Sequence, residues 1–492
     1  MQAGLICNLG GIFRRPGWVH LAPFLIVALA GLLRVVSFLP DDVSWMLNLA
    51  ERIWHGERPY IDFFDSDLPA AIFVYMPAVV LEQVTGIDAL LLVNIMTIAA
   101  GCGTVWFSLR LLMQHGVIAP GRGRMAAAVA LFVLLVLPGN TFAQRDALAA
   151  MALVPLLSLY VVRAAGEKPH WLASLAAGAL AGLAIAIKPY FAPAVLFCAL
   201  YLAFLDPSRF WSRVFSLENL FAAALLLLYA VAIFALLPGF IANALPADLI
   251  VYGPSRMSTP RLLRNEATIA IVLSASAMVL AAGNGLHKPP FAIPAVAGAG
   301  FALAFLVQAK CFPYHAYAAI AVFVLVGLAG LLAAPRRDRR FFSAAVALGV
   351  AIGLSYHNFG LPLVYPAIFH AARAVAPAHP KVTAVAGPVI GAQIARYLDG
   401  TWLLRAPSQF LTRRAEGLLK EPGLSPERRR RITELANRDV DILLDSFRGR
   451  PDLVIVDVEG RTWAARQPAV RRALEAYRPA AAAGEYTLWT RR

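Results

Sequence analysis

The chain consists of long apolar runs separated by short polar segments. A helix that crosses the hydrocarbon core of a bilayer needs about 20 mostly apolar residues, and runs of that kind predict about eleven membrane-spanning helices here. They lie near residues 18–38, 88–110, 125–140, 147–162, 171–187, 190–205, 218–240, 267–285, 291–309, 315–334 and 341–357. The pattern therefore predicts a polytopic α-helical membrane protein.

One further apolar segment, 69–84, is predicted to lie at the membrane interface without crossing. It is short, contains Pro69 and Pro77, and ends in a polar stretch with Glu82. Cytoplasmic loops carry an excess of Lys and Arg. With a cytoplasmic N-terminus, every loop follows this rule if 69–84 does not cross. If it crossed, the basic loop 336–340 would lie outside the cell.

Residues 358–492 differ from the rest, because they are rich in charge and contain no run of membrane-spanning length. Short β-type runs at 381–386, 401–405, 452–457 and 485–490 alternate with helical stretches such as 426–448. Such alternation is typical of a small α/β domain. We predict a membrane domain at 1–357, with its first periplasmic loop at 39–87, and a C-terminal periplasmic α/β domain at 358–492. The RRRR run at 428–431 is either a solvated helix face or a contact with anionic lipid.

Composition excludes several other classes of protein. Of the 492 residues, 60% are hydrophobic and 15% are charged, with a net charge of +15. The basic residues gather in the predicted cytoplasmic loops and the tail, so we expect the lipid bilayer as a partner and no nucleic acid. The four cysteines lack ligand-like spacing, which supports neither a disulfide framework nor a zinc site.

The first predicted periplasmic loop contains the strongest candidates for chemistry. Asp41 and Asp42 follow the first span directly, and the segment 44–57 has apolar and aromatic residues at helical spacing. An amphipathic helix of this kind lies in the membrane interface, so the two carboxylates would lie at headgroup depth. There, either can accept the proton of an attacking hydroxyl as general base. The alternative is that they only cap the helix.

Cations occur at three predicted outer span ends. They are Arg145 in FAQRD, Lys188 in AIKPYF and Lys310 in QAKCFPYH, the last followed by Tyr314 and His315. Cations placed there can stabilise the charge of a departing phosphate, and we predict that these five residues bind the donor phosphate. For a single lysine, snorkelling to lipid headgroups is the competing explanation. Further candidates for substrate contact are Tyr60, Asp62, Asp65, Asp146, Tyr190 and Arg256.

The order of these motifs resembles the GT-C superfamily of glycosyltransferases, and most of all the bacterial protein mannosyltransferase and lipid A aminoarabinose transferase branch. After the first span come an acidic pair, an aromatic amphipathic stretch and a G-x-x-P-Y-x-D-F-F-D motif. The matching residues are Asp41, Asp42, Gly56, Pro59, Tyr60, Asp62, Phe63, Phe64, Asp65, Leu68 and Pro69. The chain departs from the family pattern after Asp65, where Ser66-Asp67-Leu68-Pro69 replaces the usual His-Pro-Pro.

The resemblance implies a GT-C-like fold and inverting transfer from a polyprenyl-phosphate sugar at the periplasmic face of the bacterial inner membrane. It implies Asp41 as the general base, a lipid, polysaccharide or protein acceptor, and either no metal or a divalent metal. From the residues alone, three rivals stay open: a transporter or flippase of lipid-linked glycans, a glycan polymerase, and a non-enzymatic scaffold. A transporter would carry ionisable groups near the bilayer midplane and show repeated halves.

Overall fold

A computed structural model describes residues 20–492 except 37–40, 334–338, 361–365, 386 and 388–389. The predicted cytoplasmic N-terminus and residues 336–338 of the basic loop lie outside the described residues. So does the side chain of Asp41, although its backbone begins a helix.

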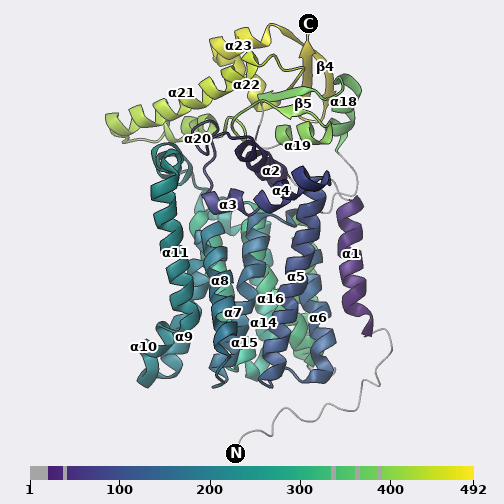
Figure 1. Cartoon of the computed structure of the whole chain (residues 1–492), viewed down its shortest axis with the longest axis vertical. Helices are drawn as coiled ribbons and strands as arrows, with labels where there is room; N and C mark the ends of the chain where they lie inside the picture. The colour runs from purple at the N-terminus through teal and green to yellow at the C-terminus, as the bar shows by residue number, and fades with distance from the viewer. Residues whose placement is uncertain (1–19, 37–40, 334–338, 361–365, 386, 388–389) are drawn as a thin grey trace, which may run out of the picture.

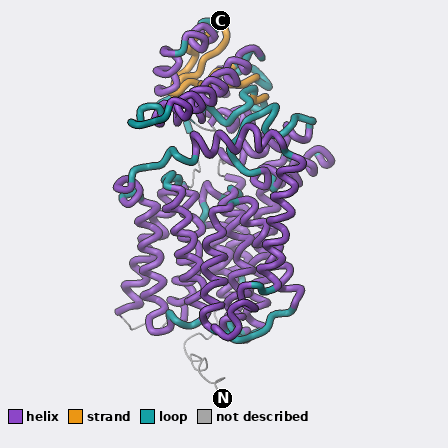
Figure 2. Tube along the Cα trace, turned by 90° about the vertical axis from the view of Figure 1, so that its left-hand side faces the viewer, coloured by secondary structure: helices purple, strands orange, loops and turns teal. Residues whose placement is uncertain are grey.

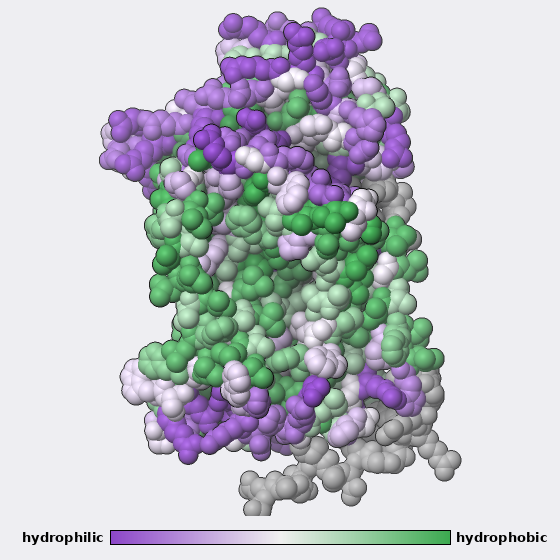
Figure 3. Space-filling model, viewed as in Figure 1, coloured by the Kyte–Doolittle hydropathy of each residue, from purple (hydrophilic) through white to green (hydrophobic). Residues whose placement is uncertain are grey.

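Long, roughly parallel helices form the membrane part (Figures 1 and 2), and their exposed surface is apolar along most of its height (Figure 3). Seven of the described helices are long and apolar enough to cross a membrane. Each predicted span corresponds to helical structure. These helices are α1 (Ala22–Val36), α5 (Ala89–Gln114), α6 (Gly123–Leu131) continued by η3 (Phe132–Val136), α7 (Arg145–Ala164), α8 (Trp171–Ile187), α9 (Ala192–Leu205), α11 (Leu217–Leu236), α14 (Glu266–Ala282), α15 (Pro289–Gln308), α16 (Pro313–Ala333) and α17 (Arg339–Phe359).

Glycines let several of these helices pack backbone to backbone, as is usual in membranes. A Cβ added at Gly178 of α8 would lie 2.5 Å from the carbonyl oxygen of Glu218 on α11. One added at Gly300 of α15 would lie 2.4 Å from the Cα atom of Ala194 on α9.

The first loop forms a layer of three helices across one end of the bundle, between the spans and the C-terminal domain (Figure 1). They are α2 (Asp41–Trp54), α3 (Pro69–Phe73) and α4 (Met76–Thr85). Residues 69–84 thus lie across the end of the bundle, while their place at the membrane interface stays a prediction. Gly86, with φ of 72°, ends α4 and accounts for the turn into α5.

The apolar face of α2, which was predicted to lie in the membrane interface, is buried within the protein. Trp45, Met46 and Leu49 are each at most 2% exposed. The C-terminal domain covers the helix from the other side, where Glu51 pairs with Arg396. These residues therefore contact protein on both sides of the layer.

The C-terminal domain contains the predicted α/β structure, a five-stranded sheet of order β2-β1-β3-β5-β4. β1 pairs in parallel with β2 and β3, while β5 runs antiparallel to β3 and β4. The strands are β1 (Lys381–Val385), β2 (Thr401–Trp402), β3 (Leu453–Asp457), β4 (Tyr477–Ala483) and β5 (Tyr486–Arg491). The helices are α18 (Ala367–Val375), α19 (Ile390–Tyr397), α20 (Phe410–Leu418), α21 (Pro426–Arg448), α22 (Val458–Arg466) and α23 (Pro468–Leu474). The domain boundary predicted at residue 357 stays a prediction.

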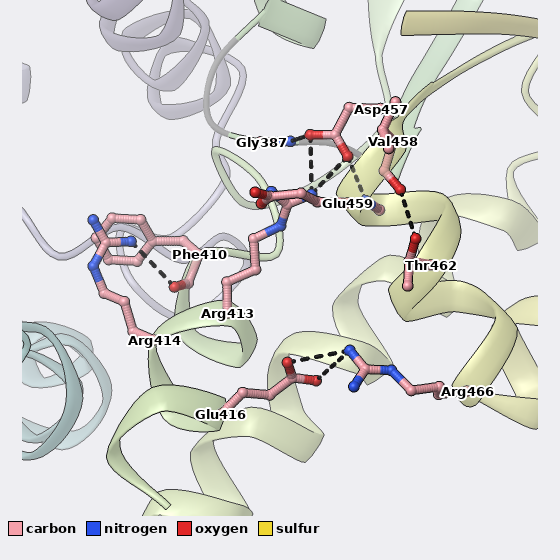
Figure 4. Close-up of polar contacts among 11 residues, drawn as sticks. Gly387, Phe410, Arg413, Arg414, Glu416, Asp457, Val458, Glu459, Thr462 and Arg466 are labelled. Atoms are coloured by element: carbon pink, nitrogen blue, oxygen red, sulfur yellow. Dashed lines mark hydrogen bonds and ion pairs between the residues drawn. The ribbon is translucent and has the colours of Figure 1, made fainter. Parts of the chain in front are cut away.

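Asp457, at the end of β3, fixes α20 against the sheet (Figure 4). Its carboxylate accepts a hydrogen bond from the Gly387 amide at 2.6 Å and pairs with Arg413 at 2.8 Å. The next residue, Arg414, lies against the Phe410 ring, 4.0 Å from its centroid, away from the Arg413–Asp457 pair (Figure 4). Because Asp457 holds α20 in place, it also sets the position of the Arg414 side chain.

Candidate functional site

Arg145 lies at the centre of a group of charged side chains at the end of the bundle that faces the C-terminal domain. It is the first residue of α7 and is 7% exposed. Its Nη2 atom is 3.3 Å from Oδ2 of Asp42 on α2, and its Nη1 atom pairs with Asp67 in the loop before α3. One guanidinium thus joins two parts of the first loop to the bundle.

A second ion pair lies next to the first. Lys188, in the turn between α8 and η5 (Pro189–Phe191), has its Nζ atom 3.1 Å from Oδ2 of Asp146. Asp146 is 1% exposed and Lys188 is 8% exposed. The Lys188 ammonium also lies 5.9 Å from the centroid of the Tyr314 ring, which is 4.6 Å from that of His315. We call Asp42, Asp67, Arg145, Asp146, Lys188, Tyr314 and His315 the Arg145 cluster.

The loop that carries Asp67 is held from behind by Asp65 and Tyr60. The Asp65 carboxylate accepts hydrogen bonds from the Asp67 amide at 2.6 Å and from Trp45 Nε1 at 2.5 Å. The buried Tyr60 hydroxyl donates to the Asp67 carbonyl at 2.7 Å. Asp65 and Tyr60 therefore position Asp67, and their predicted contact with substrate stays a prediction.

The carboxyl groups of this loop have different proton affinities. Burial raises the pKa of Asp65 to about 8, and the nearby charge of Asp67 raises it further. Burial also raises the pKa of Asp42, against the opposing charge of Arg145. For Asp67, burial acts upward but the charge and hydrogen bond of Arg145 outweigh it, so its pKa is lowered. Asp65 therefore keeps its proton to a higher pH than Asp67 does.

Lys310 and Tyr252 form a second group together with a residue of the C-terminal domain. Lys310, in the turn between α15 and α16, donates hydrogen bonds to the carbonyls of Tyr252 and Ser255. Its Nζ atom is 4.2 Å from the centroid of the Tyr252 ring, and Arg414 lies 5.0 Å from the same ring. Burial, and next the charge of Arg414, lower the pKa of Lys310 to about 8.

The remaining predicted residues lie outside the Arg145 cluster. Asp62 pairs with the exposed Arg58 at 2.8 Å. Tyr190 follows Lys188 by two positions and is 43% exposed, and Arg256 is also exposed. Neither Asp62 nor Tyr190 contributes to the ion pairs of the cluster among the described residues.

Two residues of this region were missed as site residues. Asp67 was noticed as an acid of the first loop but fell where the family pattern breaks, and its pairing with Arg145 depends on the folded loop. Arg414 is one of many arginines of the tail, and nothing in its local sequence distinguishes it.

Within the described part of the chain, no group of three or more His, Cys, Asp or Glu side chains is arranged to hold a metal ion. In the Arg145 cluster, Asp42 and Asp67 both contact the single guanidinium of Arg145.

Comparison with known proteins identifies the fold. No family model and no curated protein matches the sequence. The structure is similar to that of ArnT from Cupriavidus metallidurans bound to undecaprenyl phosphate, with a TM-score of 0.57 and 13% identity. The chain has an ArnT-like fold. The match covers 96% of this chain and 98% of ArnT. The same protein in the apo state gives a TM-score of 0.47 at 14% identity, over 96% of this chain and 97% of that one.

The ArnT-like fold confirms the resemblance to the aminoarabinose transferase branch as a likeness of fold over nearly the whole chain. It also confirms the prediction of a polytopic helical protein with a small C-terminal mixed-sheet domain. Identity of 13% says nothing about which reaction the residues perform.

Proposed function

We propose that the protein is a membrane glycosyltransferase that moves a sugar from a polyprenyl-phosphate donor to an acceptor, with inversion at the anomeric carbon. The observation that carries this proposal is the Arg145 cluster. Two buried cations at separate span ends take part: Arg145 pairs with Asp42 and Asp67 of the first loop, and Lys188 pairs with Asp146 of α7. The ArnT structure, which has the same fold, contains undecaprenyl phosphate.

The reaction needs a base and a means of stabilising the leaving group. A carboxylate of the Asp41–Asp42 pair takes the proton from the acceptor hydroxyl as its oxygen attacks the anomeric carbon. The bond between that carbon and the phosphate oxygen breaks, and polyprenyl phosphate leaves with the electron pair. The raised pKa of Asp42 favours this role, because a base works best when its pKa is near the working pH.

We assign four cations to the phosphate: Arg145 and Lys188, which would exchange their carboxylate partners for it, and Lys310 and Arg414. Negative charge grows on the phosphate as the bond breaks, and fixed cations in a partly buried site stabilise it without reorganisation. Arg414 and Lys310 both lie against the ring of Tyr252. Through Arg414, the C-terminal domain therefore contributes a side chain to the proposed site.

We place this site at the periplasmic face of the bacterial inner membrane, with the N-terminus in the cytoplasm. The positive-inside distribution of Lys and Arg supports this orientation. The acceptor is a lipid, a polysaccharide or a protein that presents a nucleophile at the headgroup level.

Sugar transfer by the purified protein in lipid nanodiscs, from a radiolabelled polyprenyl-phosphate sugar, tests the proposal. We expect Asp41→Asn or Asp42→Asn to lower the rate about 100-fold or more, as loss of a general base does. Asp445→Asn, in the exposed Arg448–Asp445 pair of α21, is the matched control and should transfer at the wild-type rate. Wild-type transfer in both Asp41→Asn and Asp42→Asn would exclude the assigned base.

A further inference from the structure

A cavity of about 560 Å³ opens at the domain-facing end of the bundle, lined by residues of α13 (Thr259–Leu263), the start of α14 and the end of α17. Arg261 and Arg264 line it together with Glu266 and Asn358. It shares no lining residue with the Arg145 cluster. The cavity is therefore a site separate from the one proposed for sugar transfer.

The side chains that line this cavity favour an anion. Neither Arg261 nor Arg264 takes part in any ion pair found among the described residues, whereas the acid that lines the cavity, Glu266, shares a hydrogen bond of 2.7 Å with His357. The Nδ2 atom of Asn358 is buried and has no hydrogen-bond partner within the described part of the chain. Two guanidinium groups and a spare amide donor are thus available to a ligand.

The first turn of α14 adds to this preference. Helix N-termini carry a partial positive charge and point free amides outward. Asn265, the N-cap of α14, satisfies only the Ala267 amide through its own side chain.

An apolar stripe runs from the cavity along α14. Ile269, Val272 and Val279 are 42%, 57% and 44% exposed. Together with Asn265 they recur at spacings of three, four or seven residues, which places them on one face of the helix. The stripe belongs to a helix that is apolar enough to cross the membrane, so this face is suited to acyl chains.

We propose that the cavity binds the phosphate of an anionic membrane lipid. Arg261 and Arg264 neutralise the headgroup, Asn358 donates a hydrogen bond to it, and the acyl chains lie along the α14 stripe. The proposal does not depend on the sugar-transfer reaction.

Native mass spectrometry of the delipidated full-length protein, titrated with phosphatidic acid or with phosphatidylcholine, tests this site. We expect phosphatidic acid to bind at least about tenfold more tightly than phosphatidylcholine, because Arg–phosphate contacts are charge-assisted. Arg261→Gln/Arg264→Gln should remove this preference. The matched control, Arg122→Gln/Arg124→Gln, removes two exposed arginines at the start of α6 and should keep the preference.

A second variant tests the role of Asn358, and a competition experiment with inorganic phosphate distinguishes a lipid site from a site for free phosphate. Asn358→Asp places a carboxylate of nearly equal size in the cavity without removing any arginine. It should weaken the binding of phosphatidic acid, because the carboxylate repels the phosphate. Millimolar inorganic phosphate should not displace the lipid, because it cannot use the α14 stripe. Displacement would show that the cavity takes free phosphate and would overturn the lipid assignment. Equal phosphatidic acid affinity in wild type and Arg261→Gln/Arg264→Gln would overturn the site itself.

Discussion

Removing the charge of Arg145 should destabilise the protein. Most of the lost stability should come from the ion pair between Arg145 and Asp67. Arg145→Gln removes the guanidinium that pairs with two neighbouring carboxylates, Asp42 and Asp67. Breaking a fully buried pair costs about 3–5 kcal/mol, whereas an exposed pair contributes less than about 1 kcal/mol. The side chain of Arg145 is 8% exposed but those of Asp42 and Asp67 are 16% and 34% exposed. We therefore expect a loss of roughly 2–3 kcal/mol in the free energy of unfolding.

A double-mutant cycle isolates the pair. Asp67→Asn alone should cost less than Arg145→Gln, because Arg145 keeps Asp42 as a partner. In the Arg145→Gln background, Asp67→Asn should cost little or restore stability, since it removes a carboxylate that has lost its cation. The expected coupling energy is at least about 1 kcal/mol, well outside the additivity of distant sites.

Unfolding by sodium dodecyl sulfate in mixed micelles, followed by tryptophan fluorescence, measures these free energies. The exposed pair Arg58–Asp62 provides the matched control, and its cycle should give no measurable coupling. If Arg145→Gln and Asp67→Asn are additive within about 0.5 kcal/mol, the ion pair does not stabilise the loop and this reasoning is refuted.

Three further predictions follow from single positions. The pKa of Asp65 is raised to about 8 from an unfolded value of 3.8, so between these values the folded state binds a proton that the unfolded state lacks. Stability should therefore fall by up to about 1.4 kcal/mol per pH unit as pH rises from 4 to 8, and less steeply in Asp65→Asn, as unfolding at a series of pH values will measure. Gly300→Ala should lower the melting temperature by forcing α15 away from α9, whereas Gly349→Ala, which meets open space, should not. If the charge of Lys310 serves the donor, transfer should decline as pH rises through about 8, and Lys310→Arg should move the decline upward.

The spans and the C-terminal domain were predictable because their signals are local. A run of apolar residues has to cross the bilayer or be buried wherever it lies, and β-type runs such as DLVIVD need only their own pattern. β4 was missed because its sequence, YRPAAAA, contains a proline and four alanines, which are poor strand formers. It is held by pairing with β5, a contact made only in the folded domain.

The site was predictable only in part, because its ion pairs, like the pairing of β4 with β5, form only in the folded protein. Cations at the ends of three predicted spans pointed to one membrane face, and Arg145 and Lys188 do lie together beside Tyr314. The partners of those cations could not be deduced. Asp67 reaches Arg145 through a loop that Tyr60 and Asp65 hold, and α2 is buried by a domain more than 300 residues away in sequence.

Several unsatisfied polar groups lie in or next to the Arg145 cluster. Gln144 Oε1, Arg145 Nε and His315 Nδ1 are buried without a hydrogen-bond partner among the described residues. Each such group costs about 1–3 kcal/mol, and native proteins keep few of them. Their gathering beside two ion pairs is unfavourable for folding alone, and departures of this kind from the rules of stable packing occur at functional sites. A phosphate and sugar bound there would supply acceptors and donors to these same atoms. Part of the binding free energy would then come from satisfying groups that the fold leaves unpaired, which is the physical reason to seek the donor at this end of the bundle.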